Sequence, residues 1–215
     1  MELFSHLTTT AIVFGLIALT CVRAGFSVAE KRAPVPDQRL KTAGEVLESF
    51  IIAVVVVFLV VRPFMVQAFY IPSESMTPTL VENDRILVSK MSYRLGKPGR
   101  AEVVVFRAPK EALSEPLDGE EKDFVKRIVG LPGDTVEIHG GITYVNGKPM
   151  KEPYTKEPVD YDLPPTMVPE GRYFVMGDNR NHSNDSHRWG TLEQDRVIGR
   201  AVMVFWPPSR AGFIK

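Results

Sequence analysis

The sequence contains a single cysteine, Cys21, which lies inside an apolar segment near the N-terminus. One thiol cannot form an intramolecular disulfide, and it cannot build the cysteine groups that bind zinc or iron–sulfur clusters. The chain also has no excess charge, since 26 Lys and Arg residues balance 26 Asp and Glu residues. A nucleic-acid partner favours a strongly basic surface, so we expect no such partner.

Long apolar segments occur only in the N-terminal third of the chain. Residues 7–22 are uncharged, which predicts a first membrane helix at about 7–24. A removable signal peptide is the alternative, but residues 1–6 lack the basic side chains that it needs. Residues 50–61 are apolar without interruption, too long a run for a usual strand, and they predict a second membrane helix at about 43–62.

The connector between the two apolar segments is basic. It contains five Lys or Arg residues, whereas no Lys or Arg precedes the first segment. By the positive-inside rule the connector is cytoplasmic, and the C-terminal domain lies on the outer face of the membrane. We therefore divide the chain into a membrane anchor, residues 1–67, and an extracytoplasmic domain, residues 68–215.

The second domain has no helical period, but it has many short β-rich stretches separated by turn signals. This pattern predicts a mainly β fold, an antiparallel sheet or barrel-like domain. Asn146-Gly147 predicts a hairpin turn and Pro132-Gly133 a type II turn, while residues 108–122 and 148–170 predict surface loops without a catalytic role. The expected strands are 69–72, 85–90, 102–107, 124–129, 135–139, 142–145, 172–176 and 197–205.

A serine and a lysine stand in contexts that suit a nucleophile and its base. Ser75 follows the second apolar segment, and Lys126 lies in an apolar run. A serine hydroxyl is a poor nucleophile at neutral pH and needs a base within hydrogen-bond reach. A lysine can be that base only if burial lowers the pKa of its amine by several units. Together the two residues predict a hydrolase.

The residues around Lys126 supply such burial if they form a strand. Residues two apart share a face of a strand, so Phe124, Lys126 and Ile128 lie together. Arg127 faces the other way, and because its guanidinium stays charged, it must meet an anion or reach solvent. An exposed strand lysine fits the same spacing, and Lys90 is a second candidate for the base.

Ser73 is a second hydroxyl beside Ser75. An extended backbone puts both side chains on one side of the chain. One hydroxyl can then attack while the other, with a backbone N–H, donates a hydrogen bond to the developing oxyanion. An ordinary Ser-rich turn after a membrane helix is the alternative.

Residues 177–190 are dense in side chains that hydrogen-bond their own backbone, which predicts a rigid loop. This loop contains His182, His187, Asp178 and Asp185. These residues leave open a Ser-His-Asp triad or a metal site. The sequence has neither a His-Glu-x-x-His motif nor a Gly-x-Ser-x-Gly elbow, which argues against both.

Four stretches, in order along the chain, resemble the motifs of bacterial type I signal peptidase. They are residues 72–76, 84–88, 126–134 and 177–186, and the resemblance covers nearly all of residues 46–206. It implies a serine peptidase with Ser75 as nucleophile, Lys126 as general base and Ser73 as oxyanion donor. It also implies that Ser183 orients the lysine amine.

The resemblance further implies how a substrate binds. A signal peptide would add to the sheet as a strand, and Phe69, Ile71 and Val125 would line the shallow pockets for its small side chains. The partners are then precursor proteins and the lipid bilayer, with no cofactor and no metal. The location is the bacterial cytoplasmic membrane, with the catalytic domain on its outer face. The sequence carries no signal for an oligomeric state.

Three positions depart from the family's usual pattern, since Asn181, His182 and His187 stand where the family often has Asp, Asn and Arg. The usual pairing of Asp185 with an arginine two residues later is therefore not expected here. We expect structural roles for Arg127, Asp178 and Asp185, and we expect Arg188 or Arg127 to pair with Asp185 instead.

Two other functions remain open. The same dyad cleaves other targets in related peptidases, and a catalytically inactive β-domain would only bind export substrates.

Overall fold

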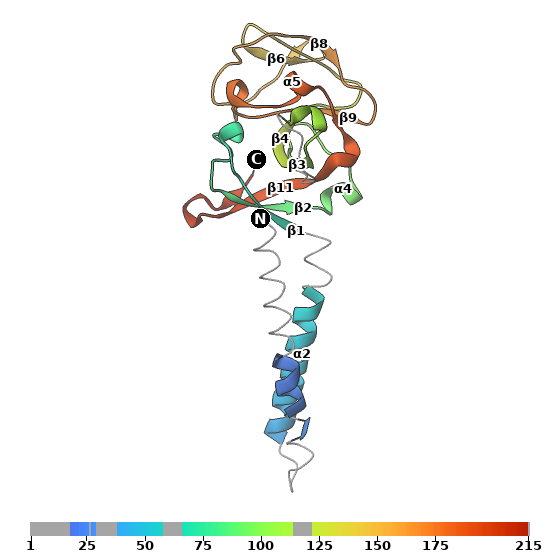
Figure 1. The fold of residues 1–215 in the computed structure, drawn as a ribbon, viewed down its shortest axis with the longest axis vertical. Coiled ribbons are helices and arrows are strands. Elements are labelled where there is room, and N and C mark those ends of the chain that lie inside the picture. Colours follow the sequence, from blue (N-terminus) through green and yellow to red (C-terminus); the bar gives the residue numbers. More distant parts are fainter. Residues whose placement is uncertain (1–17, 26, 29–37, 58–65, 114–121, 215) are drawn as a thin grey trace. The chain divides into compact units, whose positions relative to one another are not determined.

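The computed structural model describes residues 18–25, 27–28, 38–57, 66–113 and 122–214. The chain divides into two compact units, Met1–Phe64 and Met65–Lys215. The first unit contains helix α2, Gln38–Val56 (Figure 1).

The predicted membrane helices are not confirmed. Among the residues that the structure describes, no helix is both long enough and apolar enough to cross a membrane. Helix α2 carries Lys41, Glu45 and Glu48, and these charges lower its hydropathy. Most of the predicted span 7–24, and residues 58–62 of the predicted span 43–62, lie outside the described residues.

The second unit is mainly β and antiparallel, which confirms the predicted fold class. Its larger sheet has eight strands in the order β1-β2-β11-β3-β4-β9-β10, with β12 paired to β11, and its smaller sheet has the order β7-β6-β5-β8. In Figure 1, β6 and β8 lie at the opposite end of this domain from β1 and β2. The strands of the larger sheet are β1 Val66–Tyr70, β2 Arg85–Ser89, β3 Val103–Arg107, β4 Asp123–Gly130, β9 Arg172–Met176, β10 Leu192–Glu193, β11 Val197–Trp206 and β12 Gly212–Phe213. Those of the smaller sheet are β5 Thr135–His139, β6 Ile142–Val145, β7 Lys148–Pro149 and β8 Leu163–Met167.

Short helices connect the strands. They are the α-helices α4, Ser92–Leu95, and α5, Ser186–Trp189, and the 3-10 helices η2, Glu74–Met76, η3, Lys110–Ala112, η4, Arg180–His182, η5, Gln194–Arg196, and η6, Pro208–Arg210. None spans enough residues to show a helical period, which is why the sequence pattern missed them.

All eight predicted strands occur, three with the predicted ends and five with shifted ends, but β7, β8, β10 and β12 were not expected. Three of these have only two residues and therefore no alternation to detect. The fourth, β8, contains Pro164 and Pro165, which argue against a strand. It is nevertheless an edge strand of the smaller sheet, where a proline costs few ladder hydrogen bonds. The prediction of an unstructured loop at 148–170 is wrong to this extent.

Two predicted turns have the expected backbone geometry. Asn146 and Gly147 both have positive φ, 54° and 72°, in the hairpin between β6 and β7. Gly133 has φ of 84°, and the Asp134 N–H donates to the Leu131 carbonyl at 3.0 Å, which closes the turn after β4. These turns fix where β4 ends and β5 begins.

Candidate active site

The structure brings Ser75 and Lys126 together across 51 positions of sequence. Ser75 lies in η2, just after β1, and Lys126 lies in the middle of β4. The Lys126 Nζ atom is 2.7 Å from Ser75 Oγ, a hydrogen-bond distance. A serine and a lysine at this separation can exchange a proton directly.

The Lys126 side chain is almost completely buried, with 4% of its surface exposed. Burial lowers the pKa of its amine to about 8, although the nearby Asp185 and Asp178 carboxylates act to raise this pKa. Phe124 lies on the same face of β4, with its ring centroid 5.6 Å from Nζ. The alternative of an exposed strand lysine is therefore wrong. A substantial fraction of this amine is neutral near pH 8 and can accept a proton.

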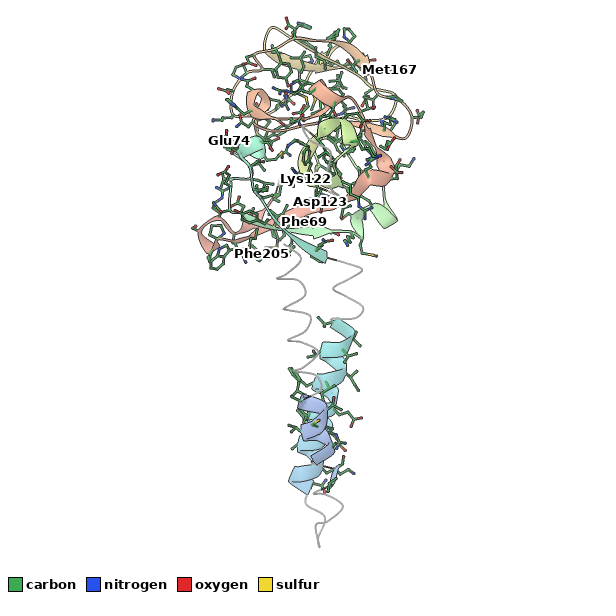
Figure 2. All side chains as sticks on the ribbon, viewed as in Figure 1. Phe69, Glu74, Lys122, Asp123, Met167 and Phe205 are labelled. Atoms are coloured by element: carbon green, nitrogen blue, oxygen red, sulfur yellow. The ribbon has the colours of Figure 1, made fainter. Side chains whose placement is uncertain are left out.

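Ser73 and Ser75 converge as their spacing predicts. Ser73 has an extended backbone, and its Oγ lies 3.3 Å from Ser75 Oγ. Ser73 is exposed and Ser75 is half-buried, so a peptide carbonyl from solvent can reach both hydroxyls. Figure 2 labels Glu74, which lies between the two serines in the sequence, and Phe69, which lies on the preceding strand β1.

Asn179 holds the turn that carries Ser75, a contact that the sequence analysis missed. Its backbone N–H donates to the Ser75 carbonyl at 3.1 Å, and its Nδ2 donates to the Glu74 carbonyl at 3.2 Å. The side chain is completely buried. Asn179 thus fixes two successive peptide groups of the serine turn. The available signal was its place in the predicted rigid loop.

Gly177 permits this close approach between the two segments. A Cβ atom at this position would overlap the Ser75 carbonyl oxygen and the Ser183 hydroxyl. Ser183 is buried beside Gly177, and its Oγ makes no hydrogen bond within the described part of the chain. The structure therefore does not show the expected contact with the Lys126 amine, and this role stays a prediction.

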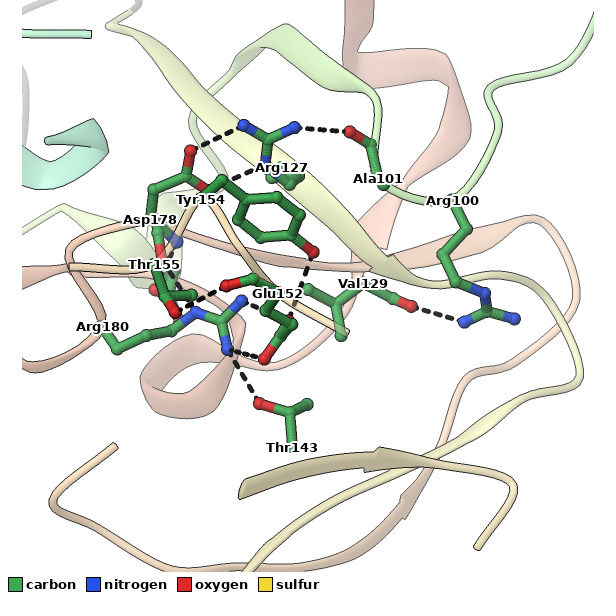
Figure 3. Close-up of polar contacts among 12 residues, drawn as sticks. Arg100, Ala101, Arg127, Val129, Thr143, Glu152, Tyr154, Thr155, Asp178 and Arg180 are labelled. Carbon is green, nitrogen blue, oxygen red and sulfur yellow. Dashed lines mark hydrogen bonds and ion pairs between the residues drawn. The ribbon is translucent and has the colours of Figure 1, made fainter. Parts of the chain in front are cut away.

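Arg127 finds its anion in Asp178, on the opposite face of β4 from Lys126. Its Nε and Nη2 atoms donate to the two Asp178 oxygens at 2.8 and 2.7 Å, a bidentate ion pair that is fully buried. Nη1 donates to the Ala101 carbonyl at 2.7 Å, and the Tyr154 ring covers the guanidinium at 3.9 Å (Figure 3). The pair joins β4 to the loop that contains Asn179.

The segment between β7 and β8, predicted to be a bland loop, supplies several of these contacts. Glu152 forms an ion pair with the buried guanidinium of Arg180, which also donates to Thr143 at 2.8 Å (Figure 3). Tyr154 covers Arg127, and Tyr161 stacks on His187 with ring centroids 4.2 Å apart. The sequence missed these roles because the partners are 25 or more positions away.

Asp185 pairs with His187, which corrects the expectation that Arg188 or Arg127 would replace the missing arginine. The Asp185 Oδ1 atom lies 2.7 Å from His187 Nδ1. Arg127 is engaged by Asp178, and Arg188 donates to His187 Nε2 at 3.1 Å. A ring nitrogen of the imidazole can form this hydrogen bond to a carboxylate, so no arginine is needed to give Asp185 a side-chain partner.

Neither histidine takes the place of the lysine. Within the described residues, the Ser75 hydroxyl contacts Lys126 and Ser73, and neither His182 nor His187 donates to it or accepts from it. The described part of the chain also holds no group of three His, Cys, Asp or Glu residues that could bind a metal ion. The geometry therefore favours the dyad over the triad and the metal site.

Phe69, Ile71 and Val125 come together in one apolar cluster beside the serine turn. Phe69 and Ile71 are buried in it, and the half-buried Val125 packs against it. The nearby Met76, also buried, connects this cluster to η2. β1 is an edge strand of the larger sheet, so one side of it is free of any described strand.

Comparison with known proteins gives consistent matches. The family model described as signal peptidase, peptidase S26, matches residues 43–206. Signal peptidase I of Leptolyngbya laminosa is 48% identical over 158 residues, which cover 74% of this chain and 77% of that protein. The probable signal peptidase I-2 of Synechocystis sp. is 41% identical over 186 residues, or 86% of this chain and 82% of that protein.

A plant protein and a solved structure are also similar. The chloroplastic thylakoidal processing peptidase 1 of Arabidopsis thaliana is 42% identical over 158 residues, or 73% of this chain and 46% of that protein. The crystal structure of a signal peptidase I from Enterococcus faecalis V583 is 32% identical, with a TM-score of 0.41, and covers 49% of this chain and 97% of that chain.

Proposed function

Because the chain belongs to the signal peptidase family, peptidase S26, and is a serine peptidase, we propose that it removes signal peptides with Ser75 as nucleophile and Lys126 as general base. The observation that carries this proposal is the 2.7 Å contact between Ser75 Oγ and a buried lysine amine. Burial lowers the pKa of Lys126 to about 8, so a neutral amine is available near physiological pH.

In the first half of the reaction, the neutral Lys126 amine takes the proton of Ser75 while Oγ attacks the carbonyl carbon of the scissile peptide bond. The carbonyl oxygen becomes an oxyanion. The Ser73 hydroxyl, 3.3 Å from Ser75 Oγ, and the Ser75 N–H donate to it. When the intermediate collapses, the Lys126 ammonium gives its proton to the leaving amine, and the mature protein departs.

The second half releases the signal peptide from the enzyme. Water gives a proton to the neutral Lys126 amine and attacks the acyl ester, and the Lys126 ammonium then returns that proton to Ser75 Oγ. The carboxylic acid of the signal peptide is the product. No metal ion is needed to balance these steps.

The substrate binds as an added strand along β1. The edge position of β1 supports this, because its outer backbone groups can pair with an extended peptide. Phe69, Ile71 and Val125 accept small side chains on the substrate near the cut. Their place in one apolar cluster beside the serine turn supports this, with Val125 half-buried and Phe69 and Ile71 buried behind it.

The protein acts at a membrane surface, with residues 1–67 as its anchor and residues 68–215 outside the cytoplasm. The basic connector between the two apolar segments supports this orientation. The membrane is the bacterial cytoplasmic membrane in the first instance. A thylakoid membrane is the second candidate, because a chloroplastic thylakoidal peptidase is among the relatives.

The test is cleavage of a precursor with Ala-x-Ala before the cut by the purified full chain. We expect Ser75→Ala and Lys126→Ala to lose at least about a thousandfold in kcat/KM while the variants stay folded. His182→Ala is the matched control, because His182 is exposed in the same loop system and should keep nearly full activity. Retained cleavage in Lys126→Ala, or loss in His182→Ala alone, contradicts the dyad. A wild-type chain that binds the precursor without cleaving it is a binding module.

A further inference from the structure

The carboxylate of Asp185 is completely buried, and its side-chain partner is an imidazole. Asp185 Oδ1 lies 2.7 Å from His187 Nδ1, and Oδ2 accepts the Gly177 N–H at 2.9 Å. Gly177 in turn packs directly against the Ser75 carbonyl. Asp185 is thus connected to the serine turn through a single residue, Gly177.

The hydrogen bonds of His187 fit an uncharged ring. Arg188 Nε donates to His187 Nε2 at 3.1 Å, which requires a lone pair on Nε2 and leaves the ring hydrogen on Nδ1, toward Asp185. The charged and titratable groups that face the ring are Asp185 and Arg188 from its own segment and Tyr161, stacked on it from the segment between β7 and β8. The imidazole satisfies the Asp185 carboxylate by hydrogen bonding, without a permanent charge of its own.

The second carboxylate near Lys126, that of Asp178, has a different kind of partner. Asp178 binds the guanidinium of Arg127 through both oxygens, so its negative charge is matched by a permanent cation. Both carboxylates favour the protonated form of the Lys126 amine. Asp185 does so more strongly, because it has no direct contact with a cation comparable to the bidentate Arg127–Asp178 pair, and the guanidinium of Arg188 reaches only the far side of the imidazole.

We propose that His187 leaves Asp185 without a fixed counter-charge and thereby sets the lowest pH at which Lys126 can act as a base. His187 is a positioning residue, since it acts on the lysine through Asp185. The proposal rests on the proposed role of Lys126. It explains what the imidazole changes relative to an arginine at the same place: the pH range of the reaction, not its chemistry.

The experiment compares the full chain with His187→Arg and His187→Gln. The measurement is kcat/KM for a precursor peptide between pH 5 and pH 10, with thermal unfolding as a check on folding. Arginine adds a cation beside Asp185 and disfavours the Lys126 ammonium. We therefore expect the acid limb, the low-pH side of the profile where kcat/KM falls, to move down by roughly half a pH unit. At a given pH on that limb, kcat/KM of His187→Arg should be about threefold higher than that of the wild type. Glutamine keeps an N–H donor and adds no charge, so the acid limb of His187→Gln should lie at the same pH as that of the wild type.

A folded His187→Arg variant with an unmoved limb overturns the proposal, and so does a Gln variant that moves as far as the Arg variant. If the Arg variant does not fold, Asp185→Asn tests the same coupling. Removing the carboxylate charge must also move the limb down, and an unmoved limb again rejects the idea. Lys126→Ala distinguishes failure of the proposed dyad from failure of the role of His187. Cleavage by Lys126→Ala refutes the dyad. If Lys126→Ala is inactive and the pH limb of His187→Arg has not moved, only the role of His187 is refuted.

Discussion

At the scale of single residues, the site consists of two side chains and a larger number of groups that hold them. Ser75 and Lys126 carry the proposed chemistry, but their 2.7 Å separation depends on the position of a short turn. Asn179 fixes this turn with two hydrogen bonds, and the Arg127–Asp178 ion pair holds the loop that contains Asn179. Small displacements of a nucleophile cost large factors in rate, so these supporting residues should be visible in kinetics.

Replacing Asn179 should lower the rate of the chemical step. Asn179→Ala removes the donor to the Glu74 carbonyl and loosens the serine turn, so we expect kcat to fall about 10- to 100-fold with little change in KM. Steady-state kinetics on a precursor peptide measure this split. Asn181→Ala is the matched control, because Asn181 contacts residues 157, 158 and 160 instead of the serine turn. A rise in KM with an unchanged kcat would assign Asn179 to substrate binding.

Breaking the Arg127–Asp178 pair should destabilise the domain. Asp178→Asn leaves a fully buried guanidinium without its negative partner, which costs about 3 kcal/mol or more in the free energy of unfolding. Urea unfolding followed by fluorescence gives this value. The control is Glu193→Gln, which removes an exposed carboxylate that pairs with Arg172 and Arg196 and should change the free energy of unfolding far less. Equal effects of the two substitutions would contradict this account.

At the scale of elements, the two faces of strand β4 meet different environments. Lys126 faces one side, with Phe124, and Arg127 faces the other side, where Asp178 and Tyr154 meet it. The period of two along a strand makes this division unavoidable for adjacent residues. One strand therefore supplies a lysine that loses its charge readily and an arginine that keeps its charge as part of the support.

The edge position of β1 gives a test of substrate binding at the same scale. A peptide that adds to β1 needs its own backbone N–H groups, so N-methylation of a substrate residue that pairs with β1 should raise KM about tenfold or more. N-methylation of the same peptide well beyond the strand is the control and should change KM little. If neither modification matters, side-chain pockets alone hold the substrate.

At the scale of the whole molecule, the apolar segments and the β-domain have different proposed roles. The β-domain contains every residue of the proposed chemistry, and the N-terminal third contains the basic connector that orients the chain in our proposal. In our proposal, the peptidase meets precursors whose apolar segment is already in the bilayer, and this confinement orients the scissile bond before it reaches Ser75.

The proposed orientation can be tested in intact cells. A protease added outside spheroplasts should remove an epitope placed after Lys215 and should leave an epitope in the 29–37 connector protected until detergent is added. Immunoblotting with both epitopes reads out the two faces. The reverse pattern, or protection of both epitopes, would reject this topology.

The sequence by itself determined the class of fold, eight of the strands, the two main turns and the residues proposed to react, because these depend on local alternation, turn geometry and motifs of adjacent residues. The tertiary structure alone decided which side chains meet. It pairs Asp185 with His187, places Asn179 on the serine turn, and brings Glu152, Tyr154 and Tyr161 from a segment that looked featureless onto the buried cations and the imidazole. Apart from the Asp185–His187 pair, these contacts join positions more than 25 residues apart in the chain, and they form only when the packed strands and loops close on one another. A local pattern carries no information about such a partner.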